Sequence, residues 1–409
     1  MDKIYNCVVC ESKSLTKVIE LGYHPPADTF VKNEQLGDPQ KVYQLSCILC
    51  GNCGHLQNKI IVPKEERYDK VDYSYTSSNS KIAREHWEEF CDTVSTYTGL
   101  TSKDHVIEFG SNDGYLLKQF DKRCIKVTGI DPSQNMVNFA IKSGVFTIKG
   151  FLDGRSIKGA VERNGKAQII IGNNVFNHIE NPNESVALIK DTLMTGGYFV
   201  FEVPYHKDLI ENYLFDTIYH EHISYFSVRS LEFLLRKNNM FITKIEHNNY
   251  HGGSLRVYTC KDESKYNKEA VDTHIRREYE NKLFSIETYK KFMDKITRDK
   301  FNVLCAIYEL KKEGKKIAAV GAAAKGNTLL NFYNLDNNII EFVTDNSEHK
   351  IGKYLPGSFI PIVNDDELSK QDIDIALILP WNIGSFLVEK TKKINKKLEF
   401  IVPGEKKLI

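Results

Sequence analysis

The sequence has no long apolar run and no excess of charge of either sign. No stretch of its 409 residues is apolar enough to span a bilayer, and the first residues contain no run of signal-peptide length. The 55 basic residues are balanced by 54 acidic ones, which argues against nucleic acid or an acidic membrane surface as a partner. Internal repeats and low-complexity tracts are also missing. We therefore expect a cytoplasmic protein made of folded domains, with neither nucleic acid nor membrane among its partners.

The length predicts two or three domains, because a single hydrophobic core rarely extends over 409 residues. Five of the nine cysteines lie in the first 53 residues. This uneven distribution indicates a separate cysteine-bearing module at the start of the chain. We predict a module over residues 1–75, a central domain over residues 76–262, and a helical linker with a C-terminal domain over residues 263–409.

The cysteine pattern predicts a structural zinc site. Cys7-x2-Cys10 and Cys50-x2-Cys53 each place two thiolates at one tight turn. Two such turns supply the four sulfur ligands that Zn²⁺ prefers in a tetrahedral site, and four protein ligands leave no open position for catalysis. Cys47 with Cys50 forms a competing pair. The alternative is a set of reduced structural cysteines without metal.

Hydrophobic periodicity predicts an α/β fold after the cysteine module. An amphipathic helix over 80–98 is followed by strands that alternate with helices, a pattern typical of βαβ units and a largely parallel sheet. A charged helical stretch over 267–313 separates this region from a second α/β segment. We expect strands at 105–109, 126–130, 167–171, 198–203, 316–320, 339–344 and 373–379, and helices at 115–120, 134–142 and 183–193.

A loop after the first predicted strand of the central domain has the features of a cofactor site. The strand carries Glu108 near its end, and a loop with Gly110 and Gly114 opens the next helix. Asp131 follows the next strand, where a carboxylate can accept both ribose hydroxyls of a nucleoside. The spacing Glu-x-Gly-x-x-x-Gly differs from the dinucleotide fingerprint and resembles motif I of class I methyltransferases.

That motif predicts S-adenosylmethionine as the cofactor, since a cation without pyrophosphate suits an acidic loop. Asn112 belongs to the same loop, and Phe151 and Asn173 are the candidates for contacts to adenine. The alternatives are a nicotinamide cofactor or no cofactor.

Two clusters of polar residues follow later strands of the same domain. Tyr219, Glu221 and His222 come after the last predicted strand, and His178 comes after the one at 167–171. Ligands of open α/β sheets bind beyond the carboxyl ends of the strands, so the two clusters are expected to meet at one pocket. Histidine is well suited to act as a general base near neutral pH. The alternative for any single histidine is a buried structural group.

Two further features are ambiguous when taken alone. Tyr73 and Tyr75 are able to reach over the pocket as a lid, or to serve as core or surface aromatics. Gly321 and Lys325 lie in a turn between a strand and a helix, which suits an anion held by backbone amides, and Asp345 follows the next strand. A domain that packs without binding, or one that binds NAD, is the alternative, although the glycine spacing argues against NAD.

Taken together, these motifs resemble those of the three-domain sugar-nucleotide C-methyltransferases, whose type members are thymidine-diphosphate-sugar C-3 methyltransferases. The resemblance runs nearly end to end. It rests on the two cysteine knuckles, Glu108-Phe-Gly110-Ser-Asn-Asp-Gly114, Tyr219-His-Glu-His222-Ile-Ser-Tyr225, His251-Gly-Gly-Ser254-Leu-Arg256, Gly321-Ala-Ala-Ala-Lys325-Gly-Asn327 and Leu355-Pro-Gly-Ser-Phe-Ile-Pro361.

The resemblance implies a zinc domain, a class I Rossmann-like methyltransferase domain and a C-terminal Rossmann-like domain that helps to bind a sugar nucleotide. It implies a 4-keto-deoxysugar methylated at the carbon next to the ketone. The implied catalytic residues are Tyr219, Glu221, His222, His178 and Tyr75 or Tyr73. The implied substrate contacts are Tyr73, Tyr225, Ser254, Arg256, Lys325, Asn327 and Asp345.

Methylation of carbon requires a carbanion, and His222 is the expected base that generates it as an enolate. Glu221 or Tyr219 is expected to orient His222, and Tyr219 or His178 to hydrogen-bond the enolate oxygen. The alternatives are an O- or N-methyltransferase acting on another small molecule, and a zinc-ribbon binding protein without catalysis.

Overall fold

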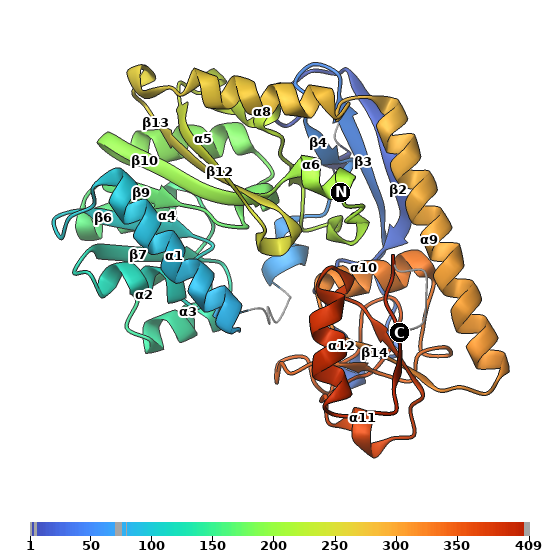
Figure 1. Ribbon diagram of the computed structural model, residues 1–409. Helices are drawn as coiled ribbons and strands as arrows, with labels where there is room; N and C mark the ends of the chain where they lie inside the picture. The colour runs from blue at the N-terminus through green and yellow to red at the C-terminus, as the bar shows by residue number, and fades with distance from the viewer. Residues whose placement is uncertain (1, 4–5, 70–75, 79, 405–409) are drawn as a thin grey trace.

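A computed structural model describes residues 2–3, 6–69, 76–78 and 80–404. The two predicted lid residues, Tyr73 and Tyr75, lie outside the described residues. Figure 1 shows a central domain on the left, a C-terminal domain at the lower right, and the strands of the N-terminal module between them. Within the described ranges, every helix is too short or too polar to cross a membrane.

The N-terminal module is built on a four-stranded antiparallel sheet with the order β11-β4-β3-β2. Its edge strand β11 comes from the middle of the chain, so the module is completed by a distant segment. Residues 45–50 of β3 are buried in succession, as in a strand that is covered on both faces. The strands of this sheet, with the small pair β1 and β5, are β1 (Asp2–Lys3), β2 (Leu15–His24), β3 (Tyr43–Cys50), β4 (Leu56–Asn58), β5 (Ile60–Ile61) and β11 (Ser224–Tyr225).

The central domain contains a seven-stranded sheet with the order β12-β13-β10-β9-β6-β7-β8. The five strands from β10 to β8 are parallel, whereas β13 and β12 are antiparallel. Its elements are α1 (Lys81–Thr98), β6 (His105–Phe109), α2 (Tyr115–Asp121), β7 (Lys126–Asp131), α3 (Gln134–Lys142), β8 (Thr147–Lys149), α4 (Gly154–Asn164), β9 (Ala167–Ile171), α5 (Pro182–Thr192), β10 (Leu193–Pro204), α6 (His206–Glu211), α7 (Val228–Lys237), β12 (Phe241–Asn248) and β13 (Ser254–Cys260).

Local sequence explains the ends of the helices in this domain. The Ser80 hydroxyl accepts a hydrogen bond from the Ala83 amide at the start of α1, and Gly99 ends α1 in the left-handed conformation. Buried apolar residues of α1, α2 and α3 cover one face of the sheet, and those of α4, α5 and α7 cover the other. The strands β6 and β9 and the helix α3 have the predicted bounds.

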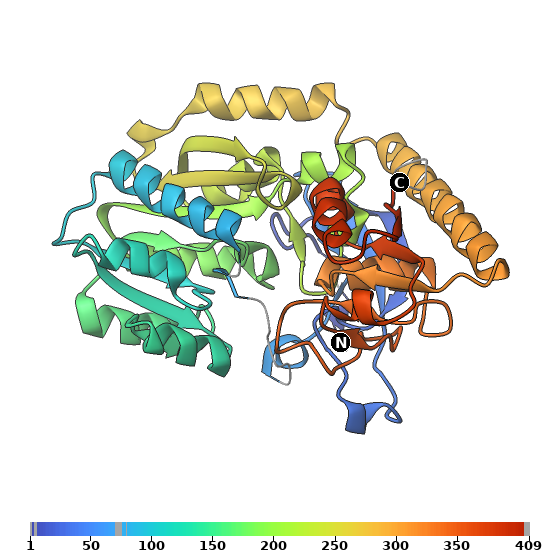
Figure 2. The same ribbon diagram turned by 60° about the horizontal axis from the view of Figure 1, so that its bottom comes forward.

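Two helices, α8 (Lys268–Glu280) and α9 (Ile286–Lys312), connect the central and C-terminal domains. The sequence predicted one continuous helical stretch here, but the chain breaks between the two helices, where Lys282 has a left-handed φ of 54°. In Figure 2, α8 runs along the top of the view and α9 runs down its right-hand side. The buried face of α9 contributes Tyr289, Phe292 and Ile296 to a core shared with the N-terminal module.

The C-terminal domain contains five parallel strands with the order β16-β15-β14-β17-β18. The strand predicted at 339–344 was too long, because the amides of Ile339 and Ile340 both donate to the Asp336 carbonyl in a turn, and only the last two residues extend the sheet. Its elements are β14 (Ile317–Val320), α10 (Ala324–Tyr333), β15 (Val343–Thr344), β16 (Ile362–Val363), α11 (Glu367–Lys370), β17 (Ile375–Ile378), α12 (Gly384–Lys392) and β18 (Glu399–Ile401).

Both parallel sheets have a point where the strand order reverses. In the central domain this point lies between β6 and β9, and in the C-terminal domain it lies between β14 and β17. Ligands of open α/β sheets bind in the crevice outside the carboxyl ends of the strands at such a point. The fold therefore offers two binding positions, one in each domain.

Candidate active site

A single large cavity of about 1290 Å³ connects these two positions. Its wall includes the loop after β6, the loop after β9, and the first turn of α10. Residues of the N-terminal module also contribute, so all three parts of the chain enclose it. Pockets for one small ligand usually measure about 300–1,000 Å³. The cavity is thus large enough for two ligands side by side.

At the central-domain end of the cavity, Glu108 and Asp131 present two buried carboxyl groups. The Asp131 carboxylate accepts hydrogen bonds from the amides of Asn112 and Ser133, both at 2.9 Å. The Oε2 atom of Glu108 has no partner among the described residues. Burial raises the pKa of Asp131 to about 6, and it raises the pKa of Glu108 further above its usual range with help from Asp113 and Asp131. Two such acids favour a cationic ligand that carries hydroxyl groups.

The glycines of this loop have a positive φ, and neighbouring side chains leave little space for a Cβ atom. Gly110 has a φ of 64°, and a Cβ atom there would lie 2.8 Å from the Val175 side chain. Gly114 has a φ of 75° and precedes α2, where a Cβ atom would lie 3.1 Å from that of Ala140. Only glycine fits both the conformation and the space at Gly110. The loop can therefore bring its backbone close to a ligand.

The predicted adenine contacts, Phe151 and Asn173, also line the cavity. Asn173 accepts a hydrogen bond from the Glu202 amide through Oδ1, while its Nδ2 has no partner among the described residues. The Phe151 ring lies 6.1 Å from the Tyr68 ring, edge to face. A free amide donor and an aromatic ring suit a heterocyclic base.

Midway along the cavity, Tyr219 and His222 form a hydrogen-bonded pair. The Tyr219 hydroxyl lies 2.6 Å from His222 Nε2, and His222 Nδ1 lies 2.8 Å from the Thr217 carbonyl oxygen. Because a carbonyl oxygen can only accept, Nδ1 carries the proton and Nε2 accepts from Tyr219. Burial lowers the pKa of His222 well below its usual value, and the positive charge of Lys325 adds to this effect. His222 is therefore a neutral imidazole with its lone pair directed at Tyr219.

His178 lies opposite this pair. Its ring centroid is 5.0 Å from that of His222, and both residues line the cavity. Its Nδ1 atom is 2.8 Å from the Tyr68 hydroxyl, and its Nε2 atom has no partner among the described residues. Burial lowers the pKa of His178 to about 3, which keeps the ring neutral.

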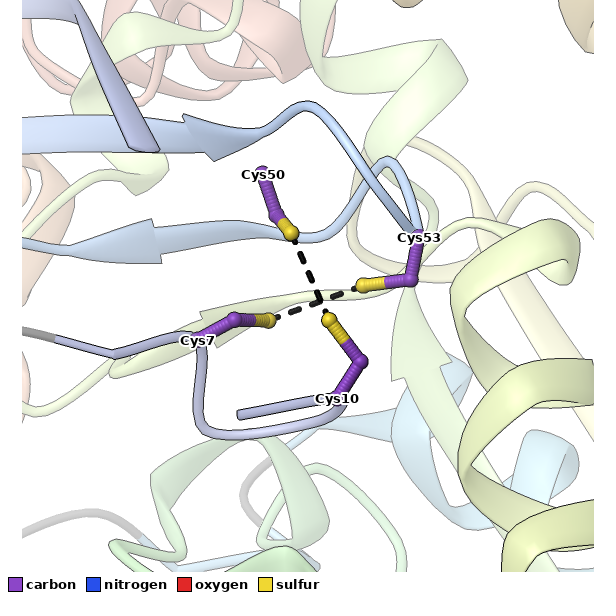
Figure 3. A group of neighbouring side chains, drawn as sticks. All are labelled: Cys7, Cys10, Cys50 and Cys53. Atoms are coloured by element: carbon purple, nitrogen blue, oxygen red, sulfur yellow. Dashed lines mark hydrogen bonds between the residues drawn. The ribbon is translucent and has the colours of Figure 1, made fainter. Parts of the chain in front are cut away.

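The four predicted zinc ligands converge at one point of the N-terminal module, with their sulfur atoms directed toward one another (Figure 3). The Sγ atoms of Cys7 and Cys53 are 3.5 Å apart, as are those of Cys10 and Cys50. A zinc tetrahedron with bonds of about 2.3 Å has sulfur–sulfur edges of about 3.8 Å, close to these distances. Cys47 lies outside the group, with its thiol 3.4 Å from Asn58 Oδ1. The structure thus selects Cys50 and Cys53 as the second knuckle.

Family models match the chain in three consecutive stretches. A "Putative zinc binding domain" matches residues 7–68, a "Methyltransferase domain" residues 81–244, and a "C-methyltransferase C-terminal domain" residues 249–403. C-methyltransferase NovU of Streptomyces niveus is 29% identical over 402 residues, which cover 98% of this chain and 95% of that protein. These matches indicate a C-methyltransferase that begins with a zinc-binding domain.

Solved structures similar to this C-methyltransferase match less than half of it. An S-adenosylmethionine-dependent methyltransferase from Clostridium acetobutylicum ATCC 824 is 11% identical with a TM-score of 0.35, covering 43% of this chain and 91% of that chain. Magnesium protoporphyrin IX methyltransferase from Synechocystis PCC 6803 is 14% identical with a TM-score of 0.34, covering 44% of this chain and 82% of that chain.

The matches to known proteins and the geometry of the cysteine cluster together show which cofactors this chain uses. The C-methyltransferase depends on S-adenosylmethionine, and its central domain has the Rossmann-like methyltransferase fold. The N-terminal module carries a zinc site made of the four clustered cysteines. None of these cysteines lines the cavity, so the metal is structural.

Glu221, a predicted catalytic residue, lies behind the cavity wall. Its carboxylate oxygens are 3.4 Å from the amides of Ala27 and Asp28, and it does not line the cavity. Burial and the neighbouring Asp28 carboxylate raise the pKa of Glu221 to about 7. In this position Glu221 holds the loop that carries Asp28, which does line the cavity.

Of the predicted substrate contacts, Lys325 lines the cavity and several others do not. Lys325 lies in the first turn of α10, with Nζ 3.3 Å from the His251 carbonyl oxygen. Burial lowers its pKa, and the Asp216 charge opposes this effect. The N-cap residue of α10, Ala323, has no side chain that can cap the amides at this end of the helix, and Ala323 and Ala324 line the cavity with Lys325.

The remaining predicted contacts are each bound to a partner behind the wall. Ser254 donates to the Tyr250 carbonyl at 2.9 Å, Arg256 pairs with Glu202 at 2.6 Å, and Asp345 accepts from the Ala322 amide at 3.1 Å. The two others are Tyr225, whose hydroxyl is 3.4 Å from Asn58 Oδ1, and Asn327, whose oxygens accept from Asn331. These residues support the elements that form the wall.

Several cavity residues were not found from the sequence. His86 and Tyr250 stack with ring centroids 3.9 Å apart and planes 5° apart, and His86 Nε2 lies 2.7 Å from the Glu202 carboxylate. Asp28, Tyr68 and Lys350 also line the cavity. They come from an amphipathic helix or from loops without a motif, so no local pattern marks them.

Proposed function

We propose that this C-methyltransferase transfers a methyl group to the carbon adjacent to the ketone, C-3, of a nucleotide-linked 4-keto-deoxysugar. The observation that carries the proposal is the continuity of the cavity from Glu108 and Asp131, through Tyr219 and His222, to Lys325. The residues that we assign to cofactor binding, proton transfer and anion binding thus line one cavity. The end-to-end likeness to a C-methyltransferase supports the same reaction class.

The end of the cavity that is lined by the C-terminal domain suits the diphosphate of a sugar nucleotide. The free amides at the start of α10 and the partial positive charge of a helix N-terminus favour an anion there. Lys325 adds a full positive charge in the same turn. The sugar ring then extends toward Tyr219 and the methyl donor.

In the reaction, Tyr219 and His222 act as a pair. The lone pair of His222 Nε2 is occupied by the Tyr219 hydroxyl, so the pair relays a proton: Tyr219 gives its proton to Nε2 as its oxygen takes the proton from C-3. The electrons of the broken C–H bond form the enolate, and S-adenosylmethionine, held near Glu108 and Asp131, would supply the methyl group that the enolate carbon takes up. Positioning of the two reactants contributes about 7–11 kcal/mol to such a step.

Substrate binding is expected to strengthen the base. The Lys325 charge is one of the causes that lower the pKa of His222. A diphosphate bound beside Lys325 offsets that charge and raises the pKa of His222. The proton acceptor therefore becomes effective when the substrate is in place.

The test is incubation of the purified protein with a panel of nucleoside-diphosphate 4-keto-6-deoxysugars. With S-adenosylmethionine, we expect one sugar to gain a methyl group on carbon. Without the cofactor, in D₂O, we expect deuterium to enter at C-3 of the same sugar. Methylation on oxygen or nitrogen, or no exchange at carbon, contradicts the proposal. Calorimetry with S-adenosylmethionine checks that the protein is active for cofactor binding.

A further inference from the structure

Two neutral histidines face the cavity with different hydrogen-bond partners. His222 Nδ1 contacts the Thr217 carbonyl, whereas His178 Nδ1 contacts the Tyr68 hydroxyl, each at 2.8 Å. A carbonyl oxygen can only accept a hydrogen bond, but a hydroxyl can also donate. The partner at Nδ1 therefore decides which nitrogen of each ring carries the proton.

The surroundings of Tyr68 favour donation to His178. Burial raises the pKa of Tyr68, so its phenol keeps its proton and must find an acceptor. The Arg67 guanidinium carbon lies 5.2 Å from the centre of the Tyr68 ring, and a guanidinium has no lone pair to offer. The lone pair of His178 Nδ1 is the acceptor at hydrogen-bond distance. His178 then carries its own proton on Nε2.

We infer that Tyr68 is a positioning residue, which holds His178 as the Nε2–H tautomer so that His178 donates to the ketone oxygen of the substrate. This inference rests on the proposed function. The Nε2 atom has no partner among the described residues, so its N–H is available to a ligand. His222 is held as the opposite tautomer by Thr217 and can accept a proton at Nε2. The ring centroids of His222 and His178 are 5.0 Å apart. One histidine donates to the enolate oxygen, and the other receives the Tyr219 proton as the Tyr219 oxygen takes the proton from carbon.

Arg67 of the N-terminal module fixes the position of Tyr68 relative to His178. The Arg67 side chain is buried and donates to the Val62 carbonyl at 2.8 Å within the module. It also donates to the His178 carbonyl at 3.3 Å and to the Glu180 carboxylate at 2.6 Å in the central domain. The zinc-bearing module thus contributes a residue to the chemistry, besides enclosing the cavity.

The first test reads the tautomers directly by NMR of the full chain labelled with ¹⁵N in the histidine rings. Protonated and unprotonated ring nitrogens have well-separated ¹⁵N shifts. We expect His178, assigned by its loss in His178→Gln, to show a protonated Nε2, and Tyr68→Phe to shift it toward a mixture of tautomers. A protonated Nδ1 in the wild type, or an unchanged spectrum in Tyr68→Phe, overturns the inference.

A matched control is available in a second buried pair, where the Tyr289 hydroxyl lies 2.8 Å from His206 Nε2 outside the cavity. Tyr289→Phe removes the same kind of hydrogen bond from a buried tyrosine. We expect it to change the signals of His206 alone and to leave kcat unchanged. Tyr68→Phe is expected to lower kcat by about 3- to 10-fold, the value of one hydrogen bond, with little change in KM.

The second test compares two amides at position 178. The side-chain NH₂ of glutamine reaches the place of Nε2, whereas that of asparagine reaches the place of Nδ1. We expect His178→Asn to lose about 100-fold or more in kcat, the cost of one missing donor to an oxyanion, and His178→Gln to retain at least tenfold more activity. Equal losses, or greater activity in His178→Asn, overturn the inference. Because the NMR measurement needs no substrate, it stands even if no sugar in the panel is methylated.

Discussion

At the scale of single residues, burial shifts the pKa values of acids and imidazoles that line the cavity toward their neutral forms. Burial raises the pKa of Glu108 and lowers that of His222, so both favour the neutral form. A bound cation or anion changes this balance, since nearby opposite charge favours ionisation. The residues of the site are therefore tuned to respond to their ligands.

Glu108→Gln is expected to weaken cofactor binding without lowering the stability of the fold. The variant loses a charged acceptor for S-adenosylmethionine, and the affinity should fall by about 10- to 100-fold, equivalent to roughly 1.5–3 kcal/mol. The free energy of unfolding without ligand should stay the same or rise, because burial already penalises the charged form of Glu108. Calorimetry and urea unfolding measure the two effects, with the exposed Glu85→Gln as control. An unchanged affinity would remove Glu108 from the cofactor site.

Tyr219→Phe is expected to lower kcat by about 10²- to 10⁴-fold, the usual contribution of a general acid or base. The variant keeps the ring and removes the hydroxyl that contacts His222 at 2.6 Å. The dissociation constant of S-adenosylmethionine should not change. Steady-state kinetics measures kcat. The control is Tyr23→Phe, which removes a hydroxyl from a side chain that is 70% exposed. A rate close to that of the wild type contradicts the relay.

At the scale of elements, two paired strands connect the zinc site to the hydrogen-bonded pair of Tyr219 and His222. The strand β4 begins three residues after Cys53 and pairs with β11, which begins two residues after His222. The Asn58 side chain at the end of β4 donates to the Tyr219 carbonyl at 3.0 Å. The zinc site therefore supports the backbone from which Tyr219 and His222 project.

Loss of zinc is expected to impair catalysis more than cofactor binding. Cys10→Ser removes one of the four ligands, and we expect a loss of bound zinc, a lower melting temperature and a large fall in kcat. The affinity for S-adenosylmethionine should change less, because Glu108 and Asp131 lie on other strands. Cys47→Ser is the control, since Cys47 is a buried thiol outside the cluster. Zinc content, melting temperature and kcat are compared, and loss of zinc in Cys47→Ser alone would contradict the ligand set.

At the scale of the whole molecule, the connecting helices are held by buried titratable groups. Tyr289 of α9 pairs with His206 of α6, and Glu278 of α8 accepts from Tyr205 at 2.9 Å and from the amides of Val228 and Arg229 at the start of α7. Burial lowers the pKa of His206 to about 3 and raises the pKa of Glu278 to about 7. These two contacts respond to pH in opposite directions.

We expect His206→Gln and Glu278→Gln to change the pH dependence of stability with opposite signs. The contribution of His206 is complete above its unfolded pKa of 6.5 and is lost as the pH falls toward 3, at about 1.4 kcal/mol per pH unit. The contribution of neutral Glu278 is complete below 4.5 and is lost as the pH rises through about 7. Urea unfolding of each variant and the wild type between pH 5 and 7.5 measures these differences. Parallel slopes would show that at least one group is not buried as described.

Features that depend on neighbouring residues or on one βαβ unit could be predicted from the amino-acid sequence. The glycine loop after β6 and Asp131 at the end of β7 had to meet, because the carboxyl ends of adjacent parallel strands lie at one edge of the sheet. The two cysteine knuckles were equally local, since each turn holds two thiolates. Helix ends followed from capping residues such as Ser80 and Gly99.

Which side chains of a motif face the cavity depends on the three-dimensional packing of the chain and could not be predicted from the sequence. Tyr219, Glu221 and His222 are close in the sequence, yet Glu221 points behind the wall while the other two line it, because the turn that carries them is irregular and no periodicity fixes its directions. The contact of Tyr68 with His178 joins residues 110 positions apart, and the pairing of Tyr225 with Leu56 joins two modules. Such contacts depend on how separate modules pack, which is a property of their combined surfaces and not of any local pattern.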